Sequence, residues 1–291
     1  MNGEALVRLE TPTSSAAIAP LGAEPREWIA DGYSLIWSGD PAWWGQRCPI
    51  LFPIVGWTRN GEMRIKGRRY PLTLHGFAAT RPFENVSRQR DSAVFRLRDD
   101  ETTRGLYPFA FELTAEYRLT PRSFSAAFRV GNPGSEPLPY AIGLHPGFAW
   151  PFAGGQGQEH SVVFDRAVSS QVPVVATGGL FSPRRRNIPL DNGRLALSPD
   201  LFGENALCFL DAASTSVSYE NGKGQAIDVA ASDFPHVAVW TRPGAPFLCI
   251  ECWTGHGDPE GFDGEIFDKP SMRILSAGAT GEHGVSYTWR S

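Results

Sequence analysis

Glu251 is a lone carboxylate within an apolar run at residues 247–253, which reads Phe-Leu-Cys-Ile-Glu-Cys-Trp. A run of this length and composition predicts a strand that is buried on both faces. Removing a carboxylate from water is costly unless the group is paired or used, and burial raises its pKa. One interpretation is structural, a salt bridge from Glu251 to Arg242 or Arg47. The other is chemical, a general base that exchanges protons near neutral pH.

Two histidines stand in apolar, glycine-rich surroundings. His75 lies in Leu-His-Gly-Phe at residues 74–77, and His145 lies in Gly-Leu-His-Pro-Gly-Phe at residues 143–148. The glycine that follows His75 permits the close approach of a ligand or of another segment. Pro146 biases His145 toward an extended backbone, which holds the imidazole at a defined exit from a strand. A lone histidine is more often a packing residue, so each of these is a candidate only.

A buried carboxylate and an imidazole suit the opening and reclosure of a sugar hemiacetal. The reaction removes a proton from the anomeric hydroxyl and delivers one to the ring oxygen, and each positioned acid or base contributes about 10²- to 10⁴-fold. It needs no metal or nucleotide, so we expect no cofactor. His75, His145 and Glu251 also match the composition of a facial metal triad, which is an alternative.

Strands must position these residues, because the dominant period of the sequence is two. At residues 111–119 apolar side chains alternate with polar ones, as is typical of a half-buried antiparallel strand. The same alternation recurs at residues 93–98, 124–130 and 285–290, and Asn-Gly pairs mark turns between such runs. We therefore predict an all-β fold, a large antiparallel β-sandwich.

No long segment has a helical period, and short helical turns are expected only at residues 41–47 or 199–206. The chain has no repeat and no linker-like change of composition. All-β folds often use this many residues in one domain. We predict that residues 1–291 form a single domain.

The composition excludes several classes of protein. The formal net charge of −4 lacks the basic footprint of a nucleic-acid binder. The first 20 residues do not resemble a signal peptide, and no run approaches the roughly 18 apolar residues of a membrane helix, so we expect a cytoplasmic protein without a membrane partner. The four cysteines, Cys48, Cys208, Cys249 and Cys252, are expected to be reduced thiols.

These residues and the segments around them make the sequence similar to the aldose 1-epimerase (galactose mutarotase-like) superfamily, specifically its bacterial LacX-like branch. The similar segments follow one another along nearly the whole chain. They are residues 48–56, 75–77, 107–109, 143–148, 201–207 and 249–253. The resemblance implies a β-supersandwich with a curved groove that binds a sugar.

The resemblance also implies roles for individual residues. His145 looks like the general acid to the ring oxygen, Glu251 like the general base on the anomeric hydroxyl, and His75 like a second groove histidine that binds the sugar. The candidate substrate-binding residues are Arg47, Phe77, Asn205 and Trp253. The chain departs from the family pattern at Trp57 and Ala79, where many relatives have arginine, at Asn205, where an aspartate is frequent, and at Cys252, where many relatives have proline.

The leading hypothesis is an aldose 1-epimerase that interconverts the α and β anomers of a hexose, acting as a monomer or homodimer. A hexose-6-phosphate 1-epimerase is the nearest alternative and would need groove arginines, for which Arg47, Arg59 and Arg81 are candidates. A non-catalytic sugar-binding protein on the same scaffold is the alternative of a different class. The presence of both His145 and Glu251 weighs against it.

Overall fold

We describe the fold from a computed structural model, in which residues 5–176, 178–210, 212 and 216–291 are described. About 47% of the chain is strand and 7% is helix, which confirms the predicted all-β class. Among the described residues, no helix is long and apolar enough to cross a membrane.

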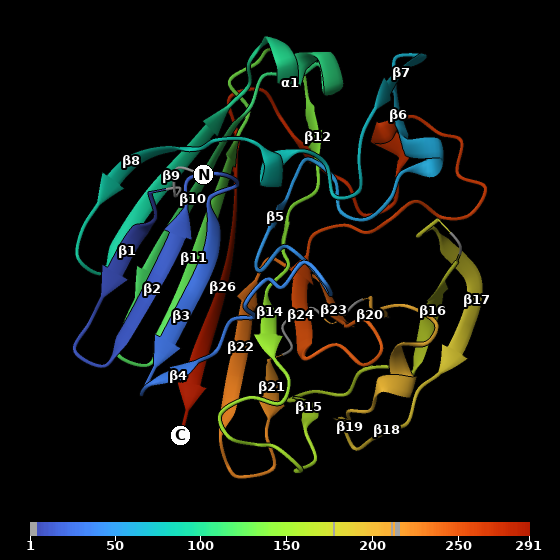
Figure 1. Ribbon diagram of the computed structural model, residues 1–291. Coiled ribbons are helices and arrows are strands. Elements are labelled where there is room, and N and C mark those ends of the chain that lie inside the picture. Colours follow the sequence, from blue (N-terminus) through green and yellow to red (C-terminus); the bar gives the residue numbers. More distant parts are fainter. Residues whose placement is uncertain (1–4, 177, 211, 213–215) are drawn as a thin grey trace.

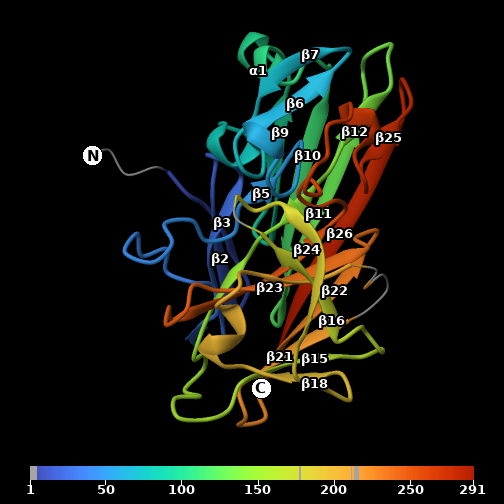
Figure 2. The ribbon, with the colours of Figure 1, turned by 90° about the vertical axis from the view of Figure 1, so that its right-hand side faces the viewer.

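The largest element is a ten-stranded antiparallel sheet, which forms the long wall of the molecule in Figures 1 and 2. Its strands, in spatial order, are β18 (Leu190–Asp191), β19 (Arg194–Ala196), β15 (Ser161–Phe164), β21 (Val217–Glu220), β22 (Ala226–Ser232), β26 (Thr280–Arg290), β11 (Ser123–Gly131), β10 (Glu112–Leu119), β9 (Ser92–Arg98) and β8 (Glu84–Arg88). Along β10 and β11 the buried residues alternate with exposed or half-buried ones, so the predicted period of two is confirmed.

A four-stranded sheet covers one end of this wall. It consists of β1 (Val7–Glu10), β2 (Ser14–Ala19), β3 (Glu24–Ala30) and β4 (Tyr33–Ser34). In Figure 1 these strands lie beside β9, β10 and β11. The buried Trp28 of β3 meets Phe124 of β11 with ring centroids 6.2 Å apart, which joins the two sheets through a shared core.

A second, six-stranded sheet carries the candidate chemistry. Its order is β20 (Leu207–Phe209), β23 (His236–Trp240), β24 (Phe247–Trp253), β13 (Gly143–Leu144) and β5 (Ile50–Leu51), and β14 (Gly147–Ala149) also pairs with β24. Strand β24 is buried at every position, as its composition predicts. Because side chains alternate along a strand, Leu248, Ile250 and Cys252 join the main core, whereas Glu251 points to the opposite side.

Smaller elements complete the fold. They are the hairpins β6 (Glu62–Ile65) with β7 (Arg68–Pro71) and β16 (Gln171–Val175) with β17 (Phe181–Asn187), the pair β12 (Leu138–Tyr140) with β25 (Arg273–Leu275), the helix α1 (Glu101–Leu106), and the 3-10 turns Arg59–Gly61, Ala78–Thr80, Pro199–Phe202 and Ile266–Asp268. The helical turn predicted within 199–206 is confirmed. At 41–47 the backbone N–H groups of Trp43 and Trp44 both donate to the carbonyl of Asp40, so this segment holds one isolated helical-type turn but no helix.

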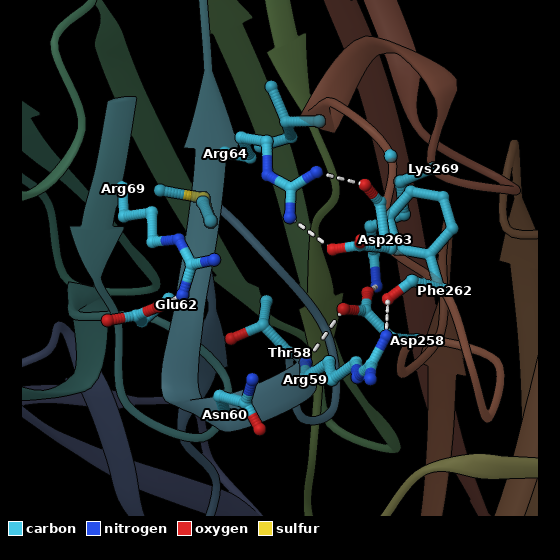
Figure 3. A pocket seen from close by; sticks show the side chains of 13 residues that line it. Thr58, Arg59, Asn60, Glu62, Arg64, Arg69, Asp258, Phe262, Asp263 and Lys269 are labelled. Carbon is cyan, nitrogen blue, oxygen red and sulfur yellow. Dashed lines mark hydrogen bonds and ion pairs between the residues drawn. The ribbon is translucent and has the colours of Figure 1, made fainter. Parts of the chain in front are cut away.

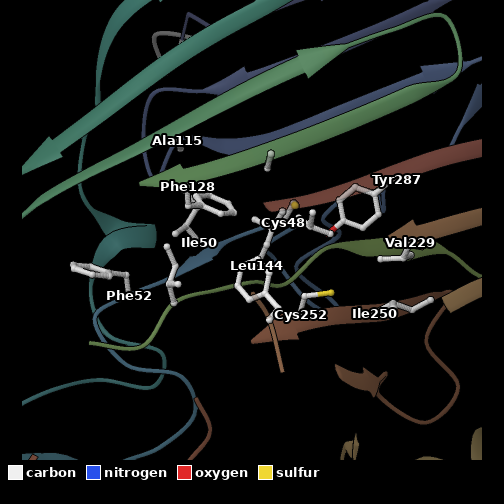
Figure 4. Close-up of a cluster of buried hydrophobic side chains, with 14 of the residues drawn as sticks. Cys48, Ile50, Phe52, Ala115, Phe128, Leu144, Val229, Ile250, Cys252 and Tyr287 are labelled. Atoms are coloured by element: carbon white, nitrogen blue, oxygen red, sulfur yellow. The ribbon is translucent and has the colours of Figure 1, made fainter. Parts of the chain in front are cut away.

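Figure 4 shows the core where the ten-stranded and six-stranded sheets meet. Phe128 of β11 and Tyr287 of β26 face Leu144 and Cys252, and all four side chains are at most 2% exposed. This contact holds β24 in place from behind, so the opposite face of β24 is available for a site.

The core predicts a specific pattern of stability. We expect Phe128→Ala to lower the free energy of unfolding by about 3–5 kcal/mol, because the ring is fully buried and its loss leaves a cavity. Arg129→Ala, next in the chain but in an exposed ion pair with Glu282, should change it by less than about 1 kcal/mol. Urea denaturation of both variants measures the difference. Equal midpoints would contradict this account of the core.

Candidate active site

The open face of the six-stranded sheet borders a cavity of about 850 Å³, hereafter the cavity. Its lining comes from three parts of the chain: the segments before and after β5, the β16–β17 hairpin, and strands β20, β23 and β24 with the loops beside them. The lining includes Trp44, Trp57, Arg59, His75, His145, Phe181, Asn205, Cys208, Trp240, Arg242, Glu251 and Trp253. The structure thus brings together three residues that are 70 to 176 positions apart in sequence, His75, His145 and Glu251.

Strand pairing explains why His145 meets Glu251. The pairs Leu144–Cys252 and Gly147–Cys249 on either side follow one continuous antiparallel register, which sets His145 directly opposite Glu251. Residues opposite each other in such a ladder bring their side chains into contact. Nε2 of His145 accordingly lies 3.4 Å from Oε1 of Glu251.

The carboxylate of Glu251 is only 2% exposed. Its Oε2 accepts a hydrogen bond from the indole N–H of Trp253, at 3.0 Å, because the two residues are two apart on one strand and share a face. Burial raises the pKa of Glu251 well above its ordinary value, and the Trp253 bond opposes that shift only in part. The structural interpretation of Glu251 is not supported, since among the described residues no ion pair joins it to Arg47 or Arg242.

His145 is also buried, with 7% of its surface exposed. Burial, and secondarily the nearby His75, lowers the pKa of its imidazole well below the ordinary value. Its Nδ1 is buried and has no hydrogen-bond partner within the described chain. The ring thus offers one nitrogen to Glu251 and keeps the other unused.

His75 occupies a tight turn that its neighbours require. Its φ is +62° and that of Gly76 is +78°, and a side chain at Gly76 would lie 2.3 Å from the carbonyl oxygen of Phe52. The backbone N–H of Gly56 donates to Nδ1 of His75 at 3.0 Å, so the neutral ring carries its proton on Nε2 and is a hydrogen-bond donor there. Burial lowers the pKa of His75 to about 4, which keeps the ring neutral near pH 7.

Of the four candidate substrate-binding residues, two line the cavity and two do not. Asn205 and Trp253 line the cavity, and Asn205 has the left-handed φ of +74° that asparagine tolerates. Phe77 and Arg47 do not line it. The turn at Gly76 sends Phe77 into the core, where its ring packs edge-on against Phe52 at 6.2 Å. Arg47 points away, because its Nη1 donates to the carbonyl of Arg26.

Sequence reasoning missed the aromatic walls of the cavity. Trp44, Trp57 and Trp240 all line it, and the ring of Trp44 stacks on that of His145 with centroids 4.8 Å apart. The only local signal was the unusual pair of tryptophans at 43 and 44 in a loop. Cys208 also lines the cavity, and burial raises the pKa of its thiol, as it does for the other three free cysteines.

A polar pocket adjoins the cavity and fixes one of its edges (Figure 3). Within it, Lys269 and Asp258 form a buried ion pair, and Arg64 pairs with Asp263. Asp258 also accepts from the backbone N–H of Arg59, whose guanidinium donates to the carbonyls of Gly261 and Phe262. These contacts anchor the segment that carries Trp57 and Arg59 to the loop after β24.

The arginines expected for a phosphate group do not gather in the cavity. Of Arg47, Arg59 and Arg81, only Arg59 lines it, and its guanidinium is engaged by two carbonyls. Arg242 is the second arginine of the lining. For a metal, no group of three or more histidine, cysteine or acidic side chains is suitably arranged in the part of the chain that the structure describes, so the triad alternative lacks support.

The fold and this site define a galactose mutarotase-like protein. The structure is similar over 99% of the chain to a galactose mutarotase related enzyme of Lactobacillus acidophilus, with a TM-score of 0.92, 30% identity and 98% of that chain covered. A galactose mutarotase-like protein of Lactobacillus casei has a TM-score of 0.91 at 25% identity, covering 98% of this chain and all of its own.

Sequence comparison gives the family. The pattern of the aldose 1-epimerase family matches residues 5–266, and the chain belongs to this family. The plasmid-encoded protein LacX of Lactococcus lactis subsp. lactis is 31% identical over 255 residues, which are 83% of this chain and 85% of LacX. The resemblance inferred from the motifs is therefore confirmed.

The depressed pKa of His75 predicts a pH dependence of stability. The unfolded chain binds a proton at this residue as the pH falls through about 6.5, whereas the folded protein does so only near pH 4. The contribution is therefore complete above pH 6.5 and is lost between 6.5 and 4. In wild type the free energy of unfolding falls between pH 6.5 and 4. In His75→Asn, whose asparagine tolerates the left-handed backbone, we expect this fall to be smaller by about 1–3 kcal/mol. Urea titrations at pH 7 and 4.5 measure this, and parallel losses in the two proteins would contradict it.

Proposed function

We propose that this protein is an aldose 1-epimerase that interconverts the α and β anomers of an unphosphorylated aldose, with Glu251 as general base and His145 as general acid. The observation that carries the proposal is the pairing of a buried carboxylate and a buried imidazole, 3.4 Å apart, in a cavity with aromatic walls. Membership of the aldose 1-epimerase family supports the same conclusion.

The proposed reaction conserves protons at every step. Glu251 accepts the proton of the anomeric hydroxyl while the His145 imidazolium gives a proton to the ring oxygen. The bond between the anomeric carbon and the ring oxygen breaks, and an open-chain aldehyde forms. Rotation about the bond next to the carbonyl presents its other face. In reclosure His145 takes the proton back from the attacking hydroxyl, and Glu251 returns its proton to the new anomeric oxygen.

Burial prepares the pair for this exchange. It raises the pKa of Glu251 and lowers that of His145, and both shifts favour a resting pair of two neutral groups that share one proton. Transfer of that proton from Glu251 to His145 produces the carboxylate and the imidazolium that the reaction needs, without a change in net charge. The cavity therefore never has to take up an isolated charge, which would be costly there.

Other side chains supply positioning. His75 presents an N–H donor at Nε2 that suits a sugar hydroxyl, and Asn205 adds an amide. The indoles of Trp57 and Trp253 provide flat apolar surfaces for the carbon face of a sugar ring. A neutral sugar is favoured over a phosphorylated one because, among the described residues, the cavity lining has two arginines, Arg59 and Arg242, and the guanidinium of Arg59 is engaged by two carbonyls. A cytoplasmic location and a monomeric or homodimeric state stay predictions.

We expect Glu251→Gln and His145→Ala each to slow anomerisation by about 10²-fold or more, because each removes one proton-transferring group. His75→Ala should mainly raise KM, since His75 positions the sugar. Polarimetry or NMR of α-to-β conversion, over a panel of free and phosphorylated aldoses, measures these rates.

Circular dichroism checks that each variant is folded, and Glu282→Gln, which alters an exposed carboxylate, is the matched control. The mechanism fails if Glu251→Gln keeps near-wild-type activity on a sugar that wild type accelerates. If the wild type binds a sugar but accelerates none, the protein is a non-catalytic sugar binder.

A further inference from the structure

The loop before β5 places an indole against the imidazole of His145. The rings of Trp44 and His145 stack with centroids 4.8 Å apart and planes 30° apart. Three further contacts fix the position of Trp44. Its ring stacks on Phe247 with centroids 5.4 Å apart. Its backbone carbonyl accepts a hydrogen bond from the indole N–H of Trp37, and its backbone N–H donates to the carbonyl of Asp40. An indole held in this way keeps its face on the imidazole without losing further conformational freedom.

The other surroundings of His145 mostly oppose a positive charge. Burial and the ring of His75, with centroids 5.6 Å away, both disfavour the imidazolium. Trp240 meets His145 edge to face, and Arg242 adds a further cation to the lining of the cavity. Glu251 favours the imidazolium only after it has lost its own proton, and Cys249, on the same face of β24, is a buried thiol with a raised pKa.

We propose that the face of Trp44 stabilises the imidazolium of His145 by a cation–π interaction and so populates the form that protonates the ring oxygen. This inference rests on the proposed function. The negative face of an indole attracts a cation within about 6 Å of the ring centroid, more strongly when water is excluded. Trp44 acts through His145, so it is a positioning residue for the acid step.

Loss of the cation–π contact would affect the charge of His145, whereas simple loss of packing would not. The reactive pair, imidazolium with carboxylate, competes with the neutral pair that holds the same single proton. Destabilising the imidazolium of His145 therefore lowers the plateau of kcat. It also moves the acidic limb of the kcat–pH profile to lower pH, by an amount that corresponds to the same free energy. A cation–π contact in a dry site corresponds to about one pH unit, or tenfold in rate.

The experiment compares Trp44→Leu, Trp44→Phe and Trp43→Leu in the full chain. Trp43 is the adjacent indole and is likewise half-buried in the same aromatic cluster. Among the described residues no ring contact joins it to His145, so it is a matched control. ¹⁵N NMR follows the charge of His145 against pH in the free protein. We expect the midpoint of the His145 titration to fall by about one pH unit in Trp44→Leu, by less in Trp44→Phe, and not at all in Trp43→Leu.

The kinetic profile gives the second readout. In Trp44→Leu we expect the plateau of kcat to fall about tenfold and the acidic limb to move down by about one pH unit. The proposal is overturned if His145 titrates in Trp44→Leu as it does in wild type. It is also overturned if His145 stays neutral in both proteins until they unfold in acid. A rise in KM alone makes Trp44 a sugar-binding platform and likewise overturns it. Because the NMR titration needs no sugar, failure of the proposed function would leave this test intact.

Discussion

The burial of the Glu251 carboxylate is the constraint on which the site depends. Strand β24 is covered on both faces, so this group is shielded from water, and within the described part of the chain its polar partners are Trp253 and His145. An uncompensated charge in such a place is costly, so burial raises the pKa of Glu251 and favours its protonated form. In the proposed mechanism His145 is the proton acceptor, and one shared proton lets the pair rest as two neutral groups and react as an ion pair.

The geometry of this pair follows from sheet pairing rather than from flexible loops. His145 and Glu251 oppose each other in an antiparallel register that is fixed by the pairs on either side. On the other flank of β24, the partner of Glu251 is Ala238, whose side chain is only a methyl group. Strand β24 thus holds the proposed base and the junction of β13 and β14 holds the proposed acid, while turns at Gly56 and Gly76 bring His75 to the same cavity.

The sequence predicts the parts of the molecule that depend on local pattern. The alternation in residues 111–119 predicted a strand, and the apolar run at 247–253 predicted a buried one; the structure contains both. Local pattern did not predict which side chains reach the cavity where the chain changes direction. The turn after His75 sends Phe77 into the core, and the carbonyl of Arg26 holds the side chain of Arg47 away from the cavity. The contact of Trp44 with His145 depends on a loop that packs across the sheet, and no local periodicity encodes such a contact. The single domain over residues 1–291 stays a prediction.

The most direct test of the central claim is a crystal structure of the Glu251→Gln variant with a bound aldose. If the buried pair performs the proton exchange, the anomeric oxygen will lie within about 3 Å of the side chain at position 251, and the ring oxygen within about 3 Å of an imidazole nitrogen of His145. A sugar bound in the cavity with both of these oxygens out of hydrogen-bonding reach of the pair would contradict the account.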